Sequence, residues 1–534
     1  MFDLPEDVLW YIFNFNSPEH PMFSHFAYRT PLYNHFGDHD TFMSTQHSSQ
    51  VCKHWRRIIL SSPSIWGRLF NLFFLSHCRK PFELIELLLE RSNGCDKIYV
   101  HGAAESKDGL WYFLELIRLR WTSVAFVHVD IRVQIALTAR ETWRNYDFMD
   151  HPAWTILKDE VSPSLEYFKL SFSGLPQSRI KHRLFINAYN QRVKFLHLHD
   201  NLRIPSDTQG PIFHNLRQLI LNLDLEQEER WTIHQFFDVL KCASLLEVLC
   251  IQRNFIHDID SSIYTSPYSI GLPHLRYLEV VDTLECCLTV LLYVEPARIC
   301  NLNLDVSVVV KEFHLLHLAT LMRVVCDRYA QCMQFQDILD LCICPGLIYL
   351  KRTPLVCCDF LSISFRPINF QFLHLPEIVD LLQNDAFKFE AVSSLRLVQW
   401  GLRFEEAISR RMEILLRQFS SVKTLITHSQ GFDRFYHWSV GGDHFSLPHI
   451  QKIYLDNQIQ IPAQSELLWE ETDQRLDLQR VLEFCKVHLK TTQEIATCQA
   501  KGETLESIDI SFLQNSDREI LLPSLLQLSG LHIL

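Results

Sequence analysis

Residues 48–69 read SSQVCKHWRRIILSSPSIWGRL and combine a cysteine, a histidine, two tryptophans and several cations. The apolar side chains in the first half recur at helical spacing, which places them on one face of an α-helix. That face consists of Val51, Cys52, Trp55, Ile58 and Ile59. The opposite face carries Lys53, His54, Arg56 and Arg57. The stretch therefore predicts an amphipathic helix with a solvated basic side.

Two further short helices are predicted on either side of this one. Ser62 and Pro63 are typical of a helix start, with Ser as N-cap and Pro at the first helical position. Near the N-terminus, residues 3–15 read DLPEDVLWYIFNF, in which Asp3 and Glu6 resemble a capping box. The apolar face of that first helix is predicted to hold Val8, Leu9, Ile12 and Phe13. Helices this short bury little apolar surface alone, so they need a partner or a following domain to pack on.

Taken in order, the three segments resemble an F-box, and most closely the F-boxes of the large fungal families. The matching residues are Leu4-Pro5, Val8 and Ile12, then Val51-Cys52, Trp55-Arg56 and Ile59, then Ser62-Pro63-Ser64-Ile65-Trp66. The resemblance covers about seventy residues. It departs from the family pattern at residues 16–46, a long insertion that we expect to form a surface loop where an F-box usually has a short link.

The resemblance implies a module that docks on the Skp-type adaptor of a cullin–RING ubiquitin ligase. Surplus apolar surface on a small helical unit agrees with a partner site. Carried over by position, the adaptor-facing or helix-packing residues are Leu4, Pro5, Val8, Ile12, Val51, Cys52, Trp55, Ile59, Pro63 and Trp66.

The composition sets wider limits on the class of protein. A chain of 534 residues is too long for one core, so we expect several domains or an elongated repeat architecture. The net charge of −12 gives no support for binding to nucleic acid or to an anionic membrane. The 16 cysteines are scattered, no apolar run is long enough to span a bilayer, and the N-terminus lacks a signal peptide pattern. We therefore expect free thiols and an intracellular location, in the cytoplasm, the nucleus or both.

Beyond residue 120 the pattern apolar-x-x-apolar-x-apolar recurs, often after Pro, Ser or Asn. The pattern alone is common by chance in an apolar sequence, so its period carries the argument. Most successive starts lie 22 to 30 residues apart, which matches the period of leucine-rich repeats. The starts are Val124, Leu165, Val193, Leu216, Leu246, Leu275, Ile299, Leu321, Leu347, Phe370, Leu395, Val422, Ile450 and Leu505.

Amphipathic helices are predicted between these strands, as at residues 232–244 and 404–419. The predicted fold class is therefore α/β, with a short N-terminal helical F-box followed by an irregular, leucine-rich-repeat-like α/β solenoid. The predicted domains are residues 1–70 for the F-box-like unit, 71–120 for a linking helix–strand–helix unit and 121–534 for the solenoid.

The usual catalytic signatures are missing from the sequence. No phosphate-binding glycine loop, G-x-S-x-G or H-E-x-x-H pattern occurs. Cys52 and His54 are two positions apart and point to different helix faces, so they are not a nucleophile and base. His35 and His39 have a spacing that can chelate zinc on a helix, but Gly37 and the polar surroundings favour a loop. We predict no catalytic residue, no metal and no cofactor.

The function predicted from these observations is that of a substrate receptor in an SCF-type (Skp–cullin–F-box) ubiquitin ligase. The F-box would bind the adaptor and the solenoid would bind a protein substrate, with no nucleic-acid or membrane partner. Two alternatives stay open. One is an interaction scaffold whose F-box-like fold does not bind the adaptor. The other is an enzyme with a site that no motif reveals.

Overall fold

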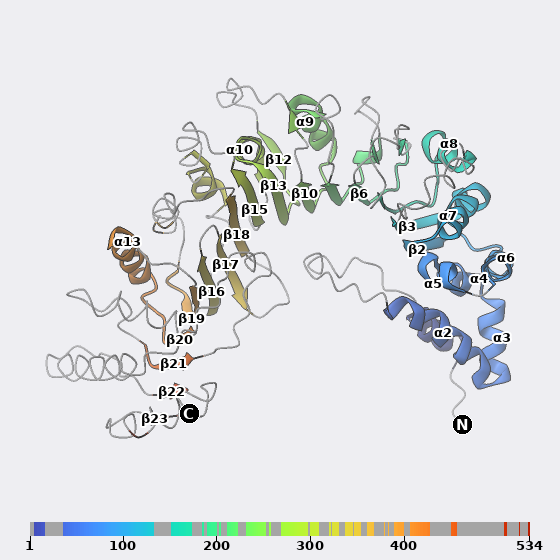
Figure 1. Cartoon of the computed structure of the whole chain (residues 1–534), viewed down its shortest axis with the longest axis horizontal. Helices are drawn as coiled ribbons and strands as arrows, with labels where there is room; N and C mark the ends of the chain where they lie inside the picture. The colour runs from blue at the N-terminus through green and yellow to red at the C-terminus, as the bar shows by residue number, and fades with distance from the viewer. Residues whose placement is uncertain are drawn as a thin grey trace, which may run out of the picture. The chain divides into compact units, whose positions relative to one another are not determined.

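A computed structural model gives the structure of the protein, drawn in Figure 1. It describes residues 5–15, 36–78, 80–132, 151–172, 184–185, 189–199, 202–203, 211–222, 231–252, 256–257, 269–296, 300–308, 320–321, 323–329, 337–344, 347–353, 360–367, 379, 383, 389–399, 406–427, 450–455, 507–509, 523 and 532–533. The chain divides into two compact units, one of Met1–Asp260 with Ile270–Leu275 and one of Ser261–Ser269 with Arg276–Leu534. The fold is mixed α/β with largely parallel sheet. This division is coarser than the predicted domains and leaves their boundaries as predictions.

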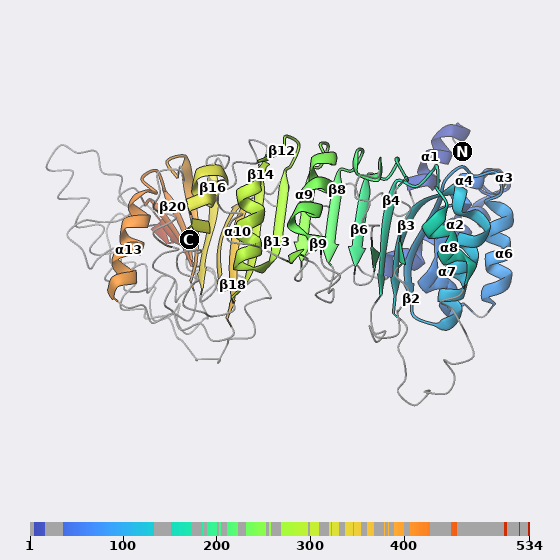
Figure 2. The ribbon, with the colours of Figure 1, turned by 90° about the horizontal axis from the view of Figure 1, so that it is seen from above.

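The first unit begins with helices and continues into a parallel sheet. The helices are α1 (Glu6–Phe15), α2 (Phe36–Val51), α3 (Lys53–Ser61), α4 (Pro63–Trp66), α5 (Leu72–His77), α6 (Pro81–Arg91), α7 (Lys107–Arg120), α8 (Pro152–Asp159) and α9 (Ile233–Cys242). The sheet holds, in spatial order, β1 (Phe70–Asn71), β2 (Ile98–Ala104), β3 (Val124–Ile131), β4 (Tyr167–Phe172), β6 (Phe195–His199), β8 (Gln218–Asn222) and β10 (Val248–Gln252). Figure 2 shows β3, β4, β6 and β8 side by side.

The two faces of this sheet differ in chemistry. One face is wholly apolar, and a single register row across it is almost completely buried: Val100, Val127, Phe168, Leu196, Leu219 and Leu249. Helix α7 contacts β2 and β3, and α7, α8 and α9 lie on one side of the strands (Figure 1). Burial of one apolar sheet face under helices is what holds a parallel sheet of this kind together.

The same turn precedes strand after strand. In several patterns the amide of the first apolar residue donates to the carbonyl three residues earlier, as Leu165 does to Ser162 and Leu216 to Phe213. The next amide then donates to the preceding strand, as Glu166 does to the Ala125 carbonyl at 2.8 Å. Equivalent bonds join Lys194 to Glu166, Arg217 to Lys194, Glu247 to Arg217, Lys423 to Ser393 and Gln451 to Lys423. This repeated bond aligns neighbouring strands without a register shift.

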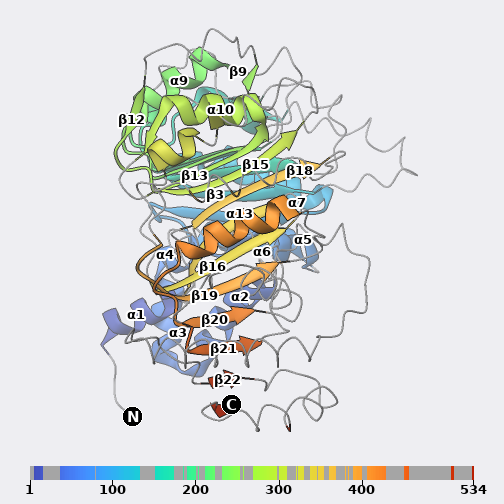
Figure 3. The same ribbon diagram turned by 90° about the vertical axis from the view of Figure 1, so that its left-hand side faces the viewer.

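The sheet strands of the second unit are parallel except at one strand. Its strands are, in spatial order, β13 (Tyr277–Thr283), β15 (Asn301–Val308), β18 (Phe360–Pro367), β17 (Leu347–Thr353), β16 (Asp337–Cys344), β19 (Val392–Gln399), β20 (Thr424–Thr427), β21 (Lys452–Leu455), β22 (Ser507–Asp509) and β23 (His532–Ile533). Strand β17 is antiparallel to both neighbours. Figure 3 shows β19, β20, β21 and β22 following one another. The helices described here include α10 (Leu284–Tyr293), which contacts β13 and β15, and α13 (Glu406–Arg417).

Short elements complete the described structure. They are β5 (Leu184–Phe185), β7 (Leu202–Arg203), β9 (Trp231–Thr232), β11 (Ile256–His257), β12 (Ile270–Leu272), β14 (Val294–Pro296), the 3₁₀ turns Trp121–Ser123 and Pro211–Phe213, and the π-helical turn Val325–Tyr329. Within the described residues, no helix has the length and apolarity needed to cross a membrane.

Most predicted strands and helices of the repeat region are confirmed. The starts at Leu165, Val193, Leu216 and Leu246 each lie two residues before a strand, and the first helix predicted there is α9. Thr232 and Gln235 form a capping box at the start of α9. The helix, strand and helix predicted in the linking unit, residues 71–120, are α6, β2 and α7. The start at Phe370 lies outside the described residues.

The strand predicted from Leu321 is wrong. Residues 320–321 and 323–324 are helical and lead into the π-helical turn Val325–Tyr329. Leu321, Val324, Val325 and Tyr329 are all buried. Val324, Val325 and Tyr329 lie three, four and eight positions after Leu321, which is the spacing of one helix face. The strand pattern also begins with apolar residues at its first and fourth positions, so its start does not distinguish a strand from a helix. Strands β16 and β18 had no predicted start of their own.

The loop predicted for residues 16–46 is also wrong over its second half, since α2 begins at Phe36. Its sequence has little amphipathic pattern, and packing explains the helix better than propensity does. Helix α2 contacts α3, and the ring of Phe42 lies 4.7 Å from that of Phe74 in α5. Residues 16–35 lie outside the described residues, and so does His35 of the candidate zinc pair.

At Gly102 the backbone of β2 approaches the start of α5 closely. Gly102 has a φ of 97°, and a Cβ placed on it would lie 2.8 Å from the Asn71 side-chain oxygen. That oxygen accepts the Phe74 amide at 3.0 Å and so caps α5. Glycine is required here both by the backbone conformation and by the approach of Asn71.

We predict that Gly102→Ala lowers the free energy of unfolding more than Gly94→Ala does. Gly94 has a similar φ of 85° but open space around it, so its alanine variant measures backbone strain alone, about 1–2 kcal/mol. The Gly102 variant adds the clash with Asn71. Urea unfolding followed by circular dichroism measures both, and equal losses in the two variants would contradict this account of Gly102.

The stability of the first unit is expected to depend on pH through the carboxyl group of Glu166. Burial raises the pKa of its carboxyl, but hydrogen bonds from Lys97 at 2.6 Å and Lys194 at 3.0 Å outweigh burial and hold that pKa below its usual value of 4.5. A carboxyl with a lowered pKa stabilises the fold above its unfolded pKa, and that stability is lost as the pH falls.

We therefore predict that Glu166→Gln destabilises the protein at pH 7 and that the gap to the wild type narrows as the pH falls below about 4.5. Urea midpoints measured across this range provide the test. Glu86→Gln, a change at an exposed position on α6, is the control and should leave the pH profile unchanged. A gap between wild type and Glu166→Gln that stays constant with pH would refute the prediction.

Candidate functional site

The candidate site is built by the N-terminal helices α1, α3 and α4. Helix α1 contacts α3 through one side, where Leu9 and Phe13 are 1% and 3% exposed. The ring of Phe13 meets that of Trp55 edge to face at 5.2 Å. These contacts attach a helix of ten residues that could not persist alone in water.

The other side of α1 is apolar and exposed. Val8 is 38%, Tyr11 58% and Ile12 41% exposed. They lie at positions i, i+3 and i+4, so they share one face of the helix. Three neighbouring apolar side chains at this exposure form a patch of the kind that binds another protein. The sequence pattern had placed Val8 and Ile12 with Leu9 and Phe13 on one face, and the structure separates the two pairs.

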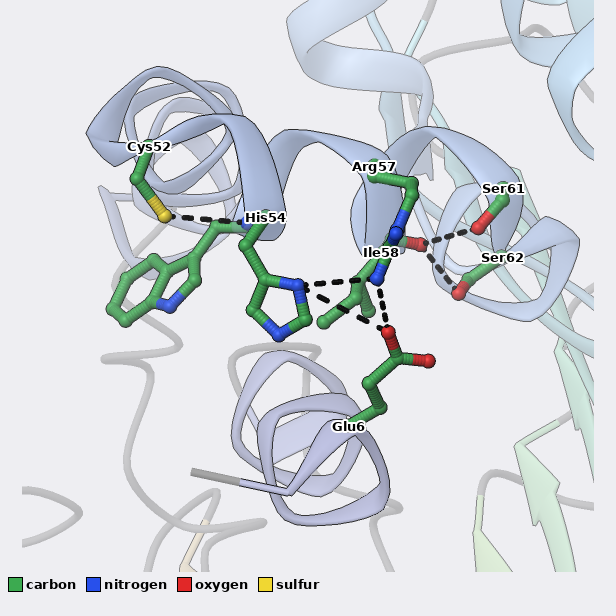
Figure 4. A network of polar contacts seen from close by, with 8 residues as sticks. Glu6, Cys52, His54, Arg57, Ile58, Ser61 and Ser62 are labelled. Carbon is green, nitrogen blue, oxygen red and sulfur yellow. Dashed lines mark hydrogen bonds and ion pairs between the residues drawn. The ribbon is translucent and has the colours of Figure 1, made fainter. Parts of the chain in front are cut away.

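A polar network fastens the start of α1 to α3, as Figure 4 shows. The Glu6 carboxylate accepts a hydrogen bond from Arg57 Nη2, and His54 Nδ1 lies 3.9 Å from the same oxygen and 3.2 Å from Arg57 Nη2. Both partners of the Glu6–Arg57 pair are largely exposed, so the pair contributes at most about 1 kcal/mol. Its effect is on orientation, because it fixes which side of α1 turns outward.

The basic side predicted for α3 is exposed, and two of its cations bind neighbouring helices. Arg57 binds α1, while Arg56 Nε donates to the Ser49 carbonyl of α2 at 3.0 Å. These contacts hold α1 and α2 against α3, and they give the cations a structural task within the fold.

The helix predicted across Val51 to Ile59 is broken at Cys52. Val51 is the last residue of α2 and is 58% exposed, while α3 begins at Lys53. Cys52 has extended backbone and caps α3, because its Sγ accepts the Trp55 amide at 3.4 Å (Figure 4). The apolar residues on both sides of Cys52 keep the spacing of a single helix, so the sequence pattern did not show that one helix ends and another begins there.

Helix α4 is confirmed, and it anchors the site to the rest of the unit. The Trp66 indole donates to the Ile59 carbonyl at 2.7 Å inside the core. Pro63 occupies the first turn as predicted, but the Ser62 hydroxyl donates to the Ile58 carbonyl at 2.6 Å instead of capping α4 (Figure 4).

The predicted site residues therefore fall into three groups. Val8, Ile12 and Val51 are exposed apolar residues and Pro5 is exposed as well; Cys52, Trp55 and Pro63 are half-buried; Ile59 and Trp66 are buried and pack the helices together. Leu4 lies outside the described residues. Tyr11 belongs to the exposed face although the resemblance did not include it, and its spacing from Val8 was the available signal.

A second concentration of polar groups lies on the sheet face opposite the apolar one. Two register rows cross β2, β3, β4 and β6 there, which we call the aromatic row and the basic row. The aromatic row is Tyr99, Phe126, Tyr167 and Phe195, and the basic row is His101, His128, Lys169 and His197. The signal was available in the sequence, since residues two and four positions after Val124, Leu165 and Val193 supply three members of each row.

The described residues hold no group of three or more metal-binding side chains. Free thiols are found at Cys52, Cys78, Cys95, Cys242, Cys250, Cys286, Cys287 and Cys300. No protein-family model matches the sequence, and no curated protein matches it either.

We predict that Phe13→Ala releases α1 from α3. Removing a buried phenylalanine costs about 3–5 kcal/mol, and the remaining contacts of α1 are few. Amide hydrogen exchange of residues 6–13 should accelerate strongly, while exchange in β3 and β4 should not change. Tyr11→Ala is the matched control, because Tyr11 lies on the exposed face. Slow exchange in α1 of the Phe13 variant would show that other contacts hold the helix.

Proposed function

We propose that the protein is the substrate receptor of an SCF-type ubiquitin ligase. In this proposal α1, α3 and α4 are an F-box that binds the Skp-type adaptor, and the sheet beyond them binds a protein substrate. The chain carries out no bond chemistry itself. It contributes proximity, by holding a substrate lysine near the ubiquitin-conjugating enzyme that the cullin–RING assembly recruits.

The exposed apolar face of α1 is the observation that carries the proposal. An isolated protein gains nothing from showing Val8, Tyr11 and Ile12 to water, whereas a partner surface would bury them and gain free energy. The face lies on the segment that resembles the adaptor-binding part of an F-box. The remaining apolar residues of that segment, such as Leu9 and Ile59, are needed to hold the helices together.

A rigid connection between the two binding surfaces also supports a receptor. The chain passes from α4 into β1 within four residues, and Leu69 and Phe70 are buried there. The Tyr99 amide donates to the Gly67 carbonyl at 2.8 Å, which ties β2 to the end of α4. A receptor that presents substrate at a fixed position needs this kind of stiff link, whereas independent binding modules do not.

We further propose that the parallel strands are irregular leucine-rich repeats and form a solenoid. Support comes from the turn that recurs before β4, β6, β8, β10 and β20, and from the inter-strand hydrogen bond that recurs before these strands and before β21. A repeat array exposes one long sheet face, which suits the recognition of a protein partner. The antiparallel strand β17 interrupts the array in the second unit.

The main competing function is an interaction scaffold that does not bind the adaptor. Helix α2 is the feature that favours it, because an F-box with the usual short link would have no such helix packed on α3. The two functions differ in one respect, which is binding of the adaptor by the exposed face of α1.

We predict that the full chain co-purifies with a Skp-type adaptor and that Val8→Asp weakens this binding at least tenfold. A carboxylate placed in an apolar contact costs several kcal/mol because it loses water without gaining a partner. Val8 is exposed, so the substitution leaves the fold intact. Pull-down and calorimetric titration with the purified adaptor measure the effect.

Val161→Asp is the matched control, since Val161 is another exposed valine of the same unit, 44% exposed and away from the N-terminal helices. It should bind the adaptor like the wild type. Equal affinity of the wild type, Val8→Asp and Val161→Asp for the adaptor would show that the adaptor binds at another surface. A folded wild-type chain that binds no adaptor would favour the interaction scaffold.

A further inference from the structure

The aromatic and basic rows form one connected array on the sheet face opposite the apolar face. The rings of Phe126 and Tyr167 stack with centroids 4.3 Å apart, and Tyr99 stacks on Phe126 at 5.8 Å. The Arg68 guanidinium lies 5.0 Å above the ring of Tyr99. The rows therefore have a rigid aromatic side and, one step further along the strands, a side rich in nitrogen donors.

Hydrogen bonds orient the basic row. Lys169 Nζ lies 2.9 Å from His128 Nε2, and the Tyr167 hydroxyl lies 3.4 Å from His197 Nδ1. An ammonium group has three donors, so a contact with one imidazole leaves Lys169 further donor capacity. Burial lowers the pKa of Lys169, with Asp130 raising it and Arg132 lowering it further. Bringing an anion close would offset this cost of burial.

The next residues along β3 and β4 add a hydroxyl and a second charged pair. The Ser171 hydroxyl donates to Asp130, and Arg132 Nη2 lies 3.2 Å from the same carboxylate. Burial raises the pKa of Asp130, but Lys169, Ser171 and their neighbours outweigh it and hold the pKa below its usual value. Asp130 is therefore ionised and already has donors, which limits its repulsion of an incoming anion.

The described charges of this face have a positive excess. Lys169 and Arg132 lie near Asp130, Arg132 also lies near Glu105, and Arg68 lies over Tyr99; three cations and two carboxylates leave one positive charge in excess, whereas the whole chain has a net charge of −12. A local positive array in an acidic protein is complementary to an anionic ligand.

The arrangement of the rings decides between two classes of anionic partner. Single-stranded nucleic acid binds sheets by stacking bases on exposed ring faces. Here the faces of Phe126 and Tyr167 cover one another, and these residues are 8% and 1% exposed. The open part of the array is instead polar: His128, Lys169 and Ser171 are partly exposed, and Arg132 is 40% exposed. That suits a carboxylate side chain and its peptide.

We propose that the part of this face formed by His128, Lys169, Ser171 and Arg132 binds an acidic segment of a protein partner. An Asp or Glu carboxylate would take donors from Lys169 and Arg132, while an apolar neighbour in the segment would lie against Tyr99, which is the half-buried ring of the aromatic row. The proposal deepens the proposed function, because it places substrate recognition on β3 and β4. It does not depend on adaptor binding, so the two can fail separately.

The test is selection from a randomised library of twelve-residue peptides on the purified full chain without adaptor. Selected peptides should be enriched in Asp or Glu next to apolar residues, and the best of them should bind Lys169→Met at least tenfold more weakly. Lys241→Met is the matched control with the same change of charge, since Lys241 lies exposed on α9. It should bind like the wild type.

Arg132→Gln provides a second variant at an exposed position, in case the loss of Lys169 unfolds the chain. Circular dichroism and urea midpoints establish which variants are folded. Three results would overturn the proposal: selected peptides without acidic residues, unchanged affinity in the folded Lys169 or Arg132 variants, or a twelve-nucleotide uridine strand that binds more tightly than any selected peptide.

Discussion

The alignment of neighbouring parallel strands is the constraint on which the rest of the first unit depends. Each strand is preceded by a turn that leaves one backbone amide directed at the strand before it, and the bond from Glu166 to Ala125 is the first of a series. Because strands have a side-chain period of two, this fixed register sends the same pattern positions to the same face every time. One face becomes wholly apolar and is buried, and the other face collects the remaining side chains into rows.

The N-terminal helices depend on that sheet in turn. Helices α1 and α4 are too short to be stable alone, and the chain passes from α4 directly into β1, where Gly102 allows close packing on Asn71. Trp66 and Ile59 form the buried link, so the helices need not use their remaining apolar residues for internal packing. Val8, Tyr11 and Ile12 therefore stay exposed and can contact a partner.

Sequence patterns predicted the elements well where one signal dominated. The capped, strongly amphipathic helix α9 and the strands after Leu165, Val193 and Leu216 appear where expected. The predictions were wrong where two structures share a pattern, as at Leu321, or where tertiary packing replaces propensity, as in α2. At Cys52 the apolar spacing ran through a helix boundary, and only the backbone conformation separates α2 from α3. The sequence also could not show which side of α1 faces outward, because Val8, Leu9, Ile12 and Phe13 are all apolar. Contacts with α3, from Phe13 to Trp55 and from Glu6 to Arg57, set the orientation.

The central claim is that the exposed side of α1 is the surface that the adaptor covers. Amide hydrogen exchange of the full chain, recorded with and without a purified Skp-type adaptor, tests it most directly. The account predicts that binding slows exchange in residues 6–13 and at the start of α3 and leaves the sheet strands unchanged. Adaptor binding that protects other segments while α1 exchanges as before would contradict it.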